Sequence, residues 1–282
     1  MPASAGRIAL IRALVPRILK NKPETVAAVG KTRLDVLLVD RSLVASRERA
    51  RALILAGRVL VNEQKIDKPG AAVVPDAAIR LLGEDMRYVS RGGLKLEAAL
   101  SHWNIDVNGR NCLDIGASTG GFTDCLLQHG AAHVTAVDTG FGQIAMKLRN
   151  DPRVRLVERT NARFLAPNAL AEAGAPVLTL LVMDVSFISA TLLLGPVFAA
   201  APELSEAIIL VKPQFEAGRG NVGKGGIVRD PEIRKLAIER VEQAVTELGW
   251  RIIETIPSPI TGAEGNQEFL LYAQPKSRTG EA

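Results

Sequence analysis

The run Asp-Ile-Gly-Ala-Ser-Thr-Gly-Gly-Phe at residues 114–122 constrains the fold more than any other feature of the chain. An apolar strand pattern precedes this run and a helical pattern follows it, so a glycine-rich turn passes a strand into a helix. Glycines allow a tight turn and close approach of a ligand, and a helix N-terminus offers unpaired N–H groups. The spacing G-x-S-x-G-G is not a dinucleotide fingerprint, and the lysine of a phosphate-binding loop is missing. We therefore expect S-adenosylmethionine here rather than NAD or ATP, with an unliganded turn as the alternative.

The rest of the chain after residue 94 alternates strand and helix patterns. Such alternation predicts an α/β fold with a mostly parallel sheet of seven strands, covered by helices on both faces. Ligands of these sheets bind outside the carboxyl ends of the strands. The predicted strands are 111–116, 132–138, 153–158, 178–184, 206–211, 250–255 and 268–274, and the predicted helices are 94–103, 120–129, 141–149, 189–200 and 230–248.

Polar residues at the first three strand ends are candidates for holding the cofactor. Asp138 ends the second strand, where an acid can accept hydrogen bonds from the two hydroxyls of a ribose; a loop cap is the alternative. Asn161 follows the third strand and could read an adenine edge, although a plain loop residue is an equal alternative. With the glycine turn, the predicted cofactor-binding residues are Asp114, Gly116, Ser118, Gly120, Gly121, Phe122, Asp138 and Asn161.

Four charged residues are predicted to meet at the same sheet edge. Asp184 and Lys212 end the fourth and fifth strands directly after apolar runs, and charges that terminate buried strands need a partner or a function. Glu268 begins the last strand and reaches the same edge if that strand is antiparallel. Lys95 lies at a helix N-terminus, where a cation is mildly unfavourable. Each alone suits a surface salt bridge, but together the four residues are better explained as one catalytic site.

Two lysines and two carboxylates suit the removal of a proton from a ribose hydroxyl while it attacks a sulfonium methyl group. We expect Lys212 to be the base, Lys95 to assist it as a neighbouring cation, and Asp184 and Glu268 to orient the lysines. The residues after Asp184 are Val-Ser-Phe rather than the Pro-Pro-aromatic run of methylases that act on base nitrogens. Neither cysteine follows the fourth strand, as base-carbon methylases require. A ribose oxygen is therefore the predicted target.

The N-terminal part carries the basic charge of the chain. Residues 1–70 hold 14 Lys or Arg against 6 Asp or Glu, whereas residues 71–282 hold 21 against 24. This asymmetry indicates a polyanionic partner, most simply nucleic acid, although a solvated basic face is the common alternative. Residues 33–39 and 47–56 are predicted helices, and 59–62 and 73–74 are predicted strands of one small sheet. The candidate RNA-binding residues are Arg33, Arg47, Arg49, Arg51 and Arg58.

Cysteine usage and hydropathy favour no metal, disulfide or membrane-spanning segment. Cys112 and Cys125 lie in no C-x-x-C or Cys/His pattern. The apolar region 175–201 contains Asp184 and Pro196, so we interpret it as core rather than as a membrane span. Residues 1–30 are predicted to be a disordered extension, with a transit peptide or an upstream start as alternatives. The remaining predicted parts are an RNA-binding domain at 31–83, a linker at 84–93 and a catalytic domain at 94–282.

The motifs also resemble known families. The pattern S-R-x-x-A-x-x-L-I-x-x-G-x-V-x-V-N that begins at Ser46 resembles the RNA-binding domain first described in small ribosomal subunit protein four. From about Thr32 to Gln274 the chain resembles the TlyA family, which joins that domain to an FtsJ-like methyltransferase domain. The strings that carry this resemblance are 90–96 (SRGGLKL), 114–122, 183–187 (MDVSF), 211–216 (VKPQFE), 223–230 (GKGGIVRD) and 265–268 (GNQE).

The resemblance implies a Rossmann-like class I methyltransferase fold with a small α+β RNA-binding domain. It also implies S-adenosyl-L-methionine as cofactor, 2'-O-methylation of cytidine in ribosomal RNA, ribosomal RNA or subunits as partners, and a cytoplasmic location. Lys95, Asp184, Lys212 and Glu268 match the family's Lys-Asp-Lys-Glu tetrad. The glycine-rich loop 218–229 is predicted to be a lid near the RNA, with a plain surface loop as the alternative. Two rival functions are a non-catalytic ribosome-assembly factor and, less favoured, a membrane-acting hemolysin.

Overall fold

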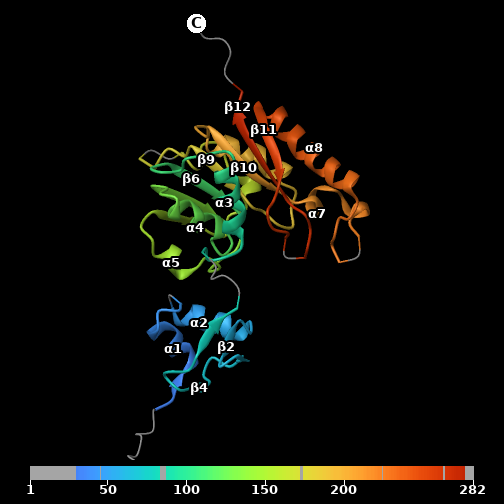
Figure 1. Ribbon diagram of the computed structural model, residues 1–282. Helices are drawn as coiled ribbons and strands as arrows, with labels where there is room; N and C mark the ends of the chain where they lie inside the picture. Colours follow the sequence, from blue (N-terminus) through green and yellow to red (C-terminus); the bar gives the residue numbers. More distant parts are fainter. Residues whose placement is uncertain are drawn as a thin grey trace, which may run out of the picture. The chain divides into compact units, whose positions relative to one another are not determined.

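The computed structural model describes residues 30–44, 46–82, 87–171, 174–223, 225–262 and 264–276. The chain divides into two compact units, residues 1–85 and 86–282 (Figure 1). Of the predicted extension, only Gly30 lies among the described residues, and the predicted linker is described from Arg87 onward. The domain boundaries stay a prediction.

In its described residues, 30–44 and 46–82, the N-terminal unit contains two helices and two small antiparallel sheets. Ser46 caps the second helix, because its Oγ accepts a hydrogen bond from the Arg49 N–H at 3.2 Å. Aliphatic side chains from both helices and the strands form its core, including Leu34, Leu38 and Ile54, which are fully buried. The elements are β1 (Thr32–Arg33), α1 (Leu34–Asp40), α2 (Arg47–Leu55), β2 (Val59–Val61), β3 (Gln64–Lys65), β4 (Ala72–Val73) and β5 (Ile79–Leu81).

The predicted pairing of 59–62 with 73–74 in one sheet is wrong. β2 pairs with β3 and β5, whereas β4 pairs with β1. The reason is a tight turn after β2, where Asn62 and Glu63 both have positive φ angles, of 50° and 63°. The chain therefore folds straight back as β3, and the unpredicted segment β5 occupies the other edge of β2.

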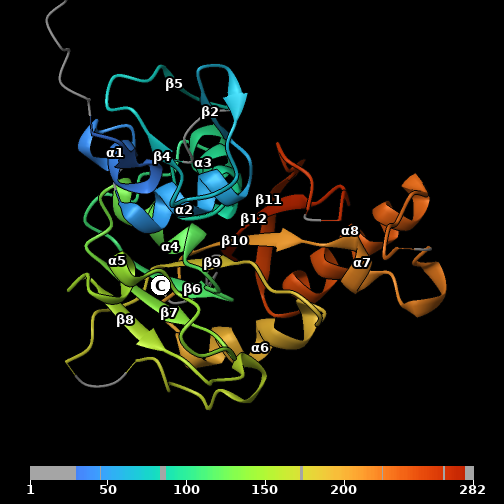
Figure 2. The same cartoon turned by 90° about the horizontal axis from the view of Figure 1, so that it is seen from below.

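The second unit is built on a seven-stranded sheet in the order β11-β12-β10-β9-β6-β7-β8. β12 is antiparallel to both of its neighbours, β10 and β11, so it alone runs opposite to the other six strands of this sheet. The predicted seven-stranded, mostly parallel α/β sheet is thus confirmed, and Figure 2 shows β8, β7, β6, β9 and β10 crossing the unit in turn. The strands are β6 (Asn111–Ile115), β7 (His133–Val137), β8 (Val154–Val157), β9 (Leu180–Met183), β10 (Glu206–Val211), β11 (Trp250–Pro257) and β12 (Phe269–Pro275).

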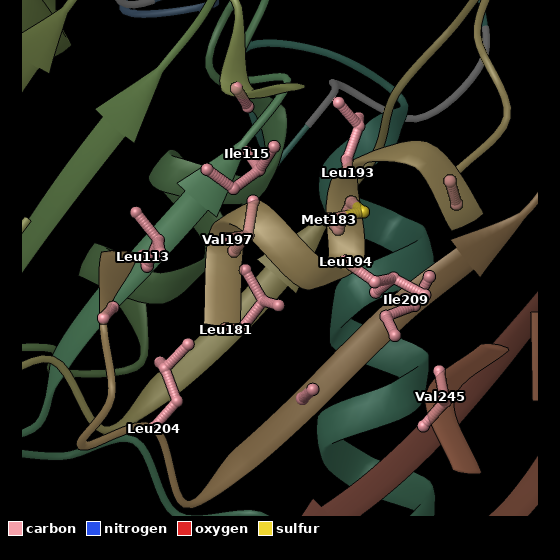
Figure 3. Close-up of a cluster of buried hydrophobic side chains, with 14 of the residues drawn as sticks. Leu113, Ile115, Leu181, Met183, Leu193, Leu194, Val197, Leu204, Ile209 and Val245 are labelled. Atoms are coloured by element: carbon pink, nitrogen blue, oxygen red, sulfur yellow. The ribbon is translucent and has the colours of Figure 1, made fainter. Parts of the chain in front are cut away.

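Helices cover both faces of this sheet because successive strand residues point to opposite sides. Leu113, Leu181 and Ile209 pack with α6 (Thr191–Ala200) and α8 (Pro231–Glu247), as Figure 3 shows for that cluster. Their neighbours Cys112, Val182 and others pack instead with α3 (Gly92–His102) and α4 (Gly121–Gln128). Burying each large side chain contributes about 1.5–3 kcal/mol. The region 175–201 therefore supplies core, in β9 and α6, as predicted. Among the described residues, no helix is long and apolar enough to cross a bilayer.

Of the five helices predicted after residue 94, four form within about two residues of their expected bounds. The helix predicted at 141–149 is wrong in its first half. Only α5 (Met146–Arg149) is helical there. Gly142 has a φ of +71°, and the Ala145 N–H bonds to the Thr119 carbonyl, so the preceding residues form a loop. Three short helices were not predicted: η1 (Ala162–Phe164), α7 (Pro213–Glu216) and η2 (Arg219–Asn221).

Candidate active site

A crevice opens at the carboxyl ends of β6 and β9. These strands are neighbours, but the chain leaves β6 toward β7 on one side and β9 toward β10 on the other, which is the point where α/β sheets bind ligands. Two cavities of about 460 and 430 Å³ lie there. Gly116, Ser118, Asp184 and Ser186 line both of them. The two cavities can therefore hold two parts of one ligand, or a ligand and a substrate.

The glycine turn fits tightly between its neighbours. A Cβ atom on Gly116, whose φ is +87°, would lie 2.4 Å from the Asp184 carbonyl oxygen. A Cβ atom on Gly121 would lie 2.2 Å from Ser90 Oγ, and one on Gly120 would meet Leu148 at the same distance. Positions 116 and 120 therefore favour glycine for their positive φ angles, and position 121 for the short distance to Ser90. The amides of Gly116 and Ala117 bond to the Val137 carbonyl, and that of Gly120 bonds to the Ala117 carbonyl, which fixes the shape of the turn.

Asp138 serves as a cap for two loops and also lines the second cavity. Its Oδ2 accepts a hydrogen bond from the Ser118 N–H at 2.8 Å, and its Oδ1 accepts one from the Gly140 N–H at 2.6 Å. Each carboxylate oxygen has a second lone pair, so further hydroxyl donors can still bind. Asn161 lines the same cavity and caps η1, because its Oδ1 accepts from the Arg163 N–H at 3.0 Å. The loop caps foreseen as alternatives exist, and they are compatible with ligand contacts.

Asp114 and Gly120, by contrast, line neither cavity. Asp114 is fully buried, with its Oδ2 accepting a hydrogen bond from Thr123 Oγ1 at 2.6 Å and its Oδ1 left without a partner. Burial raises the pKa of Asp114. The hydrogen bond from Thr123 opposes this shift and the nearby Asp184 carboxylate adds to it, and the resulting pKa is about 7. Asp114 therefore ties β6 to α4 beneath the turn, and its predicted ligand role stays a prediction.

The four predicted catalytic residues form two ion pairs. Lys95 Nζ lies 2.5 Å from Glu268 Oε2, and Lys212 Nζ lies 2.7 Å from Asp184 Oδ1. Lys212 also donates a hydrogen bond to Ser186 Oγ at 2.7 Å. The antiparallel register Val211↔Phe269 brings Glu268 to the edge where Lys212 ends β10. Lys95, Asp184 and Lys212 line the first cavity, while Glu268 lies beneath it, almost fully buried.

Sequence reasoning missed several residues around these pairs. Ser186 is a partner of Lys212, and its only signal was its place two residues after Asp184. Phe187 is 91% exposed with a φ of +66°, and its ring lies 5.5 Å from that of Phe215. A bulky residue in the left-handed region is unusual and accompanies functional sites. Ser90, Arg91, Ile260 and Thr261 complete the wall of the first cavity.

In the N-terminal unit, two of the five predicted RNA-binding arginines share a buried acid. Arg33 binds Asp35 at 2.9 Å and Arg47 binds it at 3.2 Å. The Arg33 hydrogen bond, with help from Arg47, lowers the pKa of Asp35 to about 2. Both arginine side chains remain 55% exposed, so the acid fixes their position without covering them. Arg58 donates to the Leu82 carbonyl at 2.8 Å, Arg51 is exposed and Arg49 is half-buried; RNA contacts by these residues stay a prediction.

The part of the chain that the structure describes contains no ligand set for a metal ion. No three His, Cys, Asp or Glu side chains gather there.

Comparison with known families agrees with this geometry. The model of the FtsJ-like methyltransferases matches residues 88–274, and that of the S4 domain matches residues 32–79. The first match includes the glycine turn, both cavities and all four charged residues, and the second includes the basic module.

Individual relatives match nearly the full length. A protein from Bacillus subtilis that carries the name YqxC, a candidate rRNA methyltransferase, is 48% identical over 86% of this chain and 85% of its own. The 16S/23S rRNA (cytidine-2'-O)-methyltransferase TlyA of Mycobacterium tuberculosis is 46% identical over 86% and 89%. A solved structure of a candidate hemolysin from Streptococcus thermophilus is 42% identical over 89% and 90%, with a TM-score of 0.66.

Proposed function

The chain belongs to the TlyA family of FtsJ-like methyltransferases that carry an S4 domain, and we propose that it transfers a methyl group from S-adenosylmethionine to the ribose 2'-hydroxyl of cytidine in ribosomal RNA. The observation that carries this proposal is the pairing of Lys212 with Asp184 at the wall of a cavity that adjoins the glycine turn. With ribosomal RNA as the substrate, we expect the protein to act in the cytoplasm.

The residues of the crevice fit the proposed cofactor. The second cavity has Asp138 and Asn161 for the ribose and adenine, and the turn residues Gly116 and Ser118 lead from it into the first cavity. Neither cavity wall carries the lysine of a phosphate-binding loop, which agrees with a cofactor that has no phosphate. When bound, S-adenosylmethionine supplies an electrophilic methyl group on a sulfonium.

The chain's own residues then prepare the hydroxyl. Lys212, positioned by Asp184 and Ser186, would act as the neutral amine and take the proton of the 2'-hydroxyl while the ribose oxygen bonds to the methyl carbon and the electron pair of the broken carbon–sulfur bond stays on sulfur. Lys95 lies in the same cavity and is fixed by Glu268, so it contributes positive charge without moving. Phe187 stands exposed beside these groups and offers a ring on which the target base can stack. The S4 unit supplies the arginines that hold the RNA backbone.

A direct test uses the full chain with ribosomal RNA from cells that lack the gene and S-adenosylmethionine labelled in its methyl group. We expect label on the RNA, at cytidine riboses, located by resistance to alkaline cleavage. Label on a base would contradict the ribose assignment.

Binding of the RNA with no transfer of label would favour the assembly-factor alternative. The hemolysin name of one relative calls for a second measurement, release of a dye from liposomes without the cofactor, in which we expect no release.

A further inference from the structure

Three phenylalanines are exposed on successive loops at the carboxyl edge of the sheet. Phe141, Phe164 and Phe187 follow β7, β8 and β9 and are 62%, 75% and 91% exposed. In the part of the chain that the structure describes, every other aromatic side chain is buried or half-buried. Phe187 adjoins the catalytic cavity, but Phe141 and Phe164 line neither of the two cavities there. The exposure of these two rings needs another explanation, because a ring left in water contributes no burial of apolar surface to the stability of the fold.

Each of these two rings has an arginine against it. The guanidinium of Arg159 lies 4.1 Å from the centre of the Phe141 ring, and that of Arg163 lies 5.8 Å from the Phe164 ring. Both arginines are exposed. A cation over a ring fixes the ring's orientation and adds about 0.5–1 kcal/mol at exposed sites. The rings are therefore presented in a defined position rather than left to move freely.

Backbone hydrogen bonds join the two loops into one surface. The Arg159 N–H bonds to the Gly140 carbonyl at 3.0 Å, and the Thr160 N–H bonds to the Asp138 carbonyl at 3.0 Å. The Gly142 N–H bonds to Glu158 Oε1 at 2.8 Å. Phe141 and Arg159 thus lie on two joined loops, and Arg163 and Phe164 follow Arg159 on the second of them; these four residues are hereafter the arginine–phenylalanine surface.

The charge around this surface differs from the rest of its unit. Residues 139–164 contain six Lys or Arg against two Asp or Glu, although residues 71–282 as a whole carry more acids than bases. Three of these cations are paired, Arg149 with Glu158 at 2.6 Å, Arg153 with Asp151 at 2.8 Å and Lys147 with Asp124 at 2.9 Å. The positive charge at the rings therefore comes from the exposed Arg159 and Arg163, which suits a phosphate at this position.

We propose that the arginine–phenylalanine surface binds a single-stranded stretch of the RNA substrate outside the catalytic cavity, and this proposal rests on the function proposed above. Bases stack on the exposed faces of Phe141 and Phe164, while Arg159 and Arg163 contact phosphates. Aromatic rings alternating with cations are how proteins hold single strands without reading their sequence. A purely apolar protein partner would not account for the arginines, and phosphates alone would not account for the rings.

The test compares three double variants of the full chain in binding to a fluorescein-labelled single-stranded RNA and to the same RNA as a duplex. In Phe141→Ala/Phe164→Ala we expect single-strand affinity to fall about tenfold or more, since stacking of each base contributes on that scale. In Arg159→Ala/Arg163→Ala we expect a weaker dependence on salt, with a log–log slope reduced by about 0.7 for each lost phosphate contact. Leu236→Ala/Arg251→Ala removes an exposed apolar residue and an exposed arginine elsewhere, and should bind as the wild type does.

The measurements separate this proposal from its premise. Equal single-strand binding by all variants would overturn the proposal even if methyl transfer is normal. Loss of binding by both surface variants in a protein that transfers no methyl group would support the surface and reject the proposed function. A fall in S-adenosylmethionine affinity in the phenylalanine variant, with RNA binding unchanged, would assign the rings to the cofactor instead. Binding of the wild type to anionic vesicles as tightly as to RNA would also count against the proposal.

Discussion

The two lysine–carboxylate pairs of the active site look alike in the sequence but differ in their surroundings. Lys95 and Glu268 join α3 to the start of β12, and their side chains are only 9% and 3% exposed. Lys212 and Asp184 end β10 and β9, and Asp184 is 20% exposed toward the crevice. Lys212 Nζ donates a further hydrogen bond to Ser186 Oγ, in addition to its ion pair with Asp184. Lys95 Nζ donates its hydrogen bond to Glu268. Both lysines line the first cavity with nearly equal exposure, 9% and 10%, so the pairs differ in their carboxylates: Glu268 is buried, whereas Asp184 opens onto the cavity.

In the proposed mechanism this difference assigns the two pairs different roles. A base has to exchange its proton with the substrate and then with water, and the Lys212 pair has its carboxylate at the cavity wall for that exchange. The buried Glu268 carboxylate instead holds the charge of Lys95 in a fixed place without reorganisation. The predictions below test that division.

The largest effect is expected from Lys212→Met. Removal of a general base lowers kcat by about 10²–10⁴-fold. The methyl donor should bind as before, because the lysine contacts the carboxylate and serine rather than the glycine turn. Single-turnover transfer to RNA measures the first quantity and calorimetric titration the second. Lys235→Met, on an exposed lysine of α8, is the control and should retain wild-type activity. Normal transfer by Lys212→Met would end the assignment of this residue as the base.

Lys95→Met should instead be costly for stability. Removing one partner of a buried pair leaves an uncompensated charge on Glu268, which typically costs about 3–5 kcal/mol. For a unit of this size that lowers the Tm by on the order of 10 °C. The double variant Lys95→Met/Glu268→Gln should regain much of the loss because the stranded charge is gone, yet stay inactive. If Lys212→Met destabilises the unit as much as Lys95→Met, then the contrast between a buried and an open carboxylate partner is wrong.

The sequence could predict that these four charges meet, because topology decides it. A charge that ends a buried parallel strand must emerge at the carboxyl edge, as Asp184 and Lys212 do. The place of Glu268 depended on the direction of the last strand, which is indeed antiparallel. Seven strands were also recognisable, since strands buried on both faces are nearly continuous apolar runs.

The pairing of the charges could not be predicted. Lys95 and Glu268 are 173 positions apart, and nothing local distinguishes Glu268 from Asp184 as the partner of either lysine. The loops could not be predicted either. The glycines around Phe141 break a helix that the apolar pattern predicted. The cation over the Phe141 ring comes from Arg159, on a different loop. Contacts between loops depend on the folded sheet beneath them rather than on local preference.

Ser186→Ala is the next test in size. Lys212 would lose a hydrogen bond to Oγ but keep its ion pair with Asp184, so we expect kcat to fall by about 10- to 150-fold, which corresponds to the roughly 1.5–3 kcal/mol of a bond to a charged group. The KM for RNA should not change. Ser186→Thr keeps the hydroxyl and should recover most of the activity, and the exposed Ser205→Ala should have no effect. A changed KM with constant kcat would make Ser186 a substrate contact rather than a partner of the base.

Asp114 supplies the smallest test, because it is a carboxylate as buried as Glu268 but without a lysine. Its pKa is raised from 3.8 to about 7 by burial, so the folded chain binds its proton more tightly than the unfolded chain does. The resulting stability is present below about pH 4 and is lost as the pH rises through 7. Asp114→Asn cannot titrate, so its Tm minus that of the wild type should increase by about a few degrees from pH 5 to pH 8. Calorimetry at both pH values measures this, with the exposed Asp106→Asn following the wild type. A constant difference between Asp114→Asn and the wild type would mean that the carboxyl is charged throughout, and that burial beneath the glycine turn is offset by a contact other than Thr123.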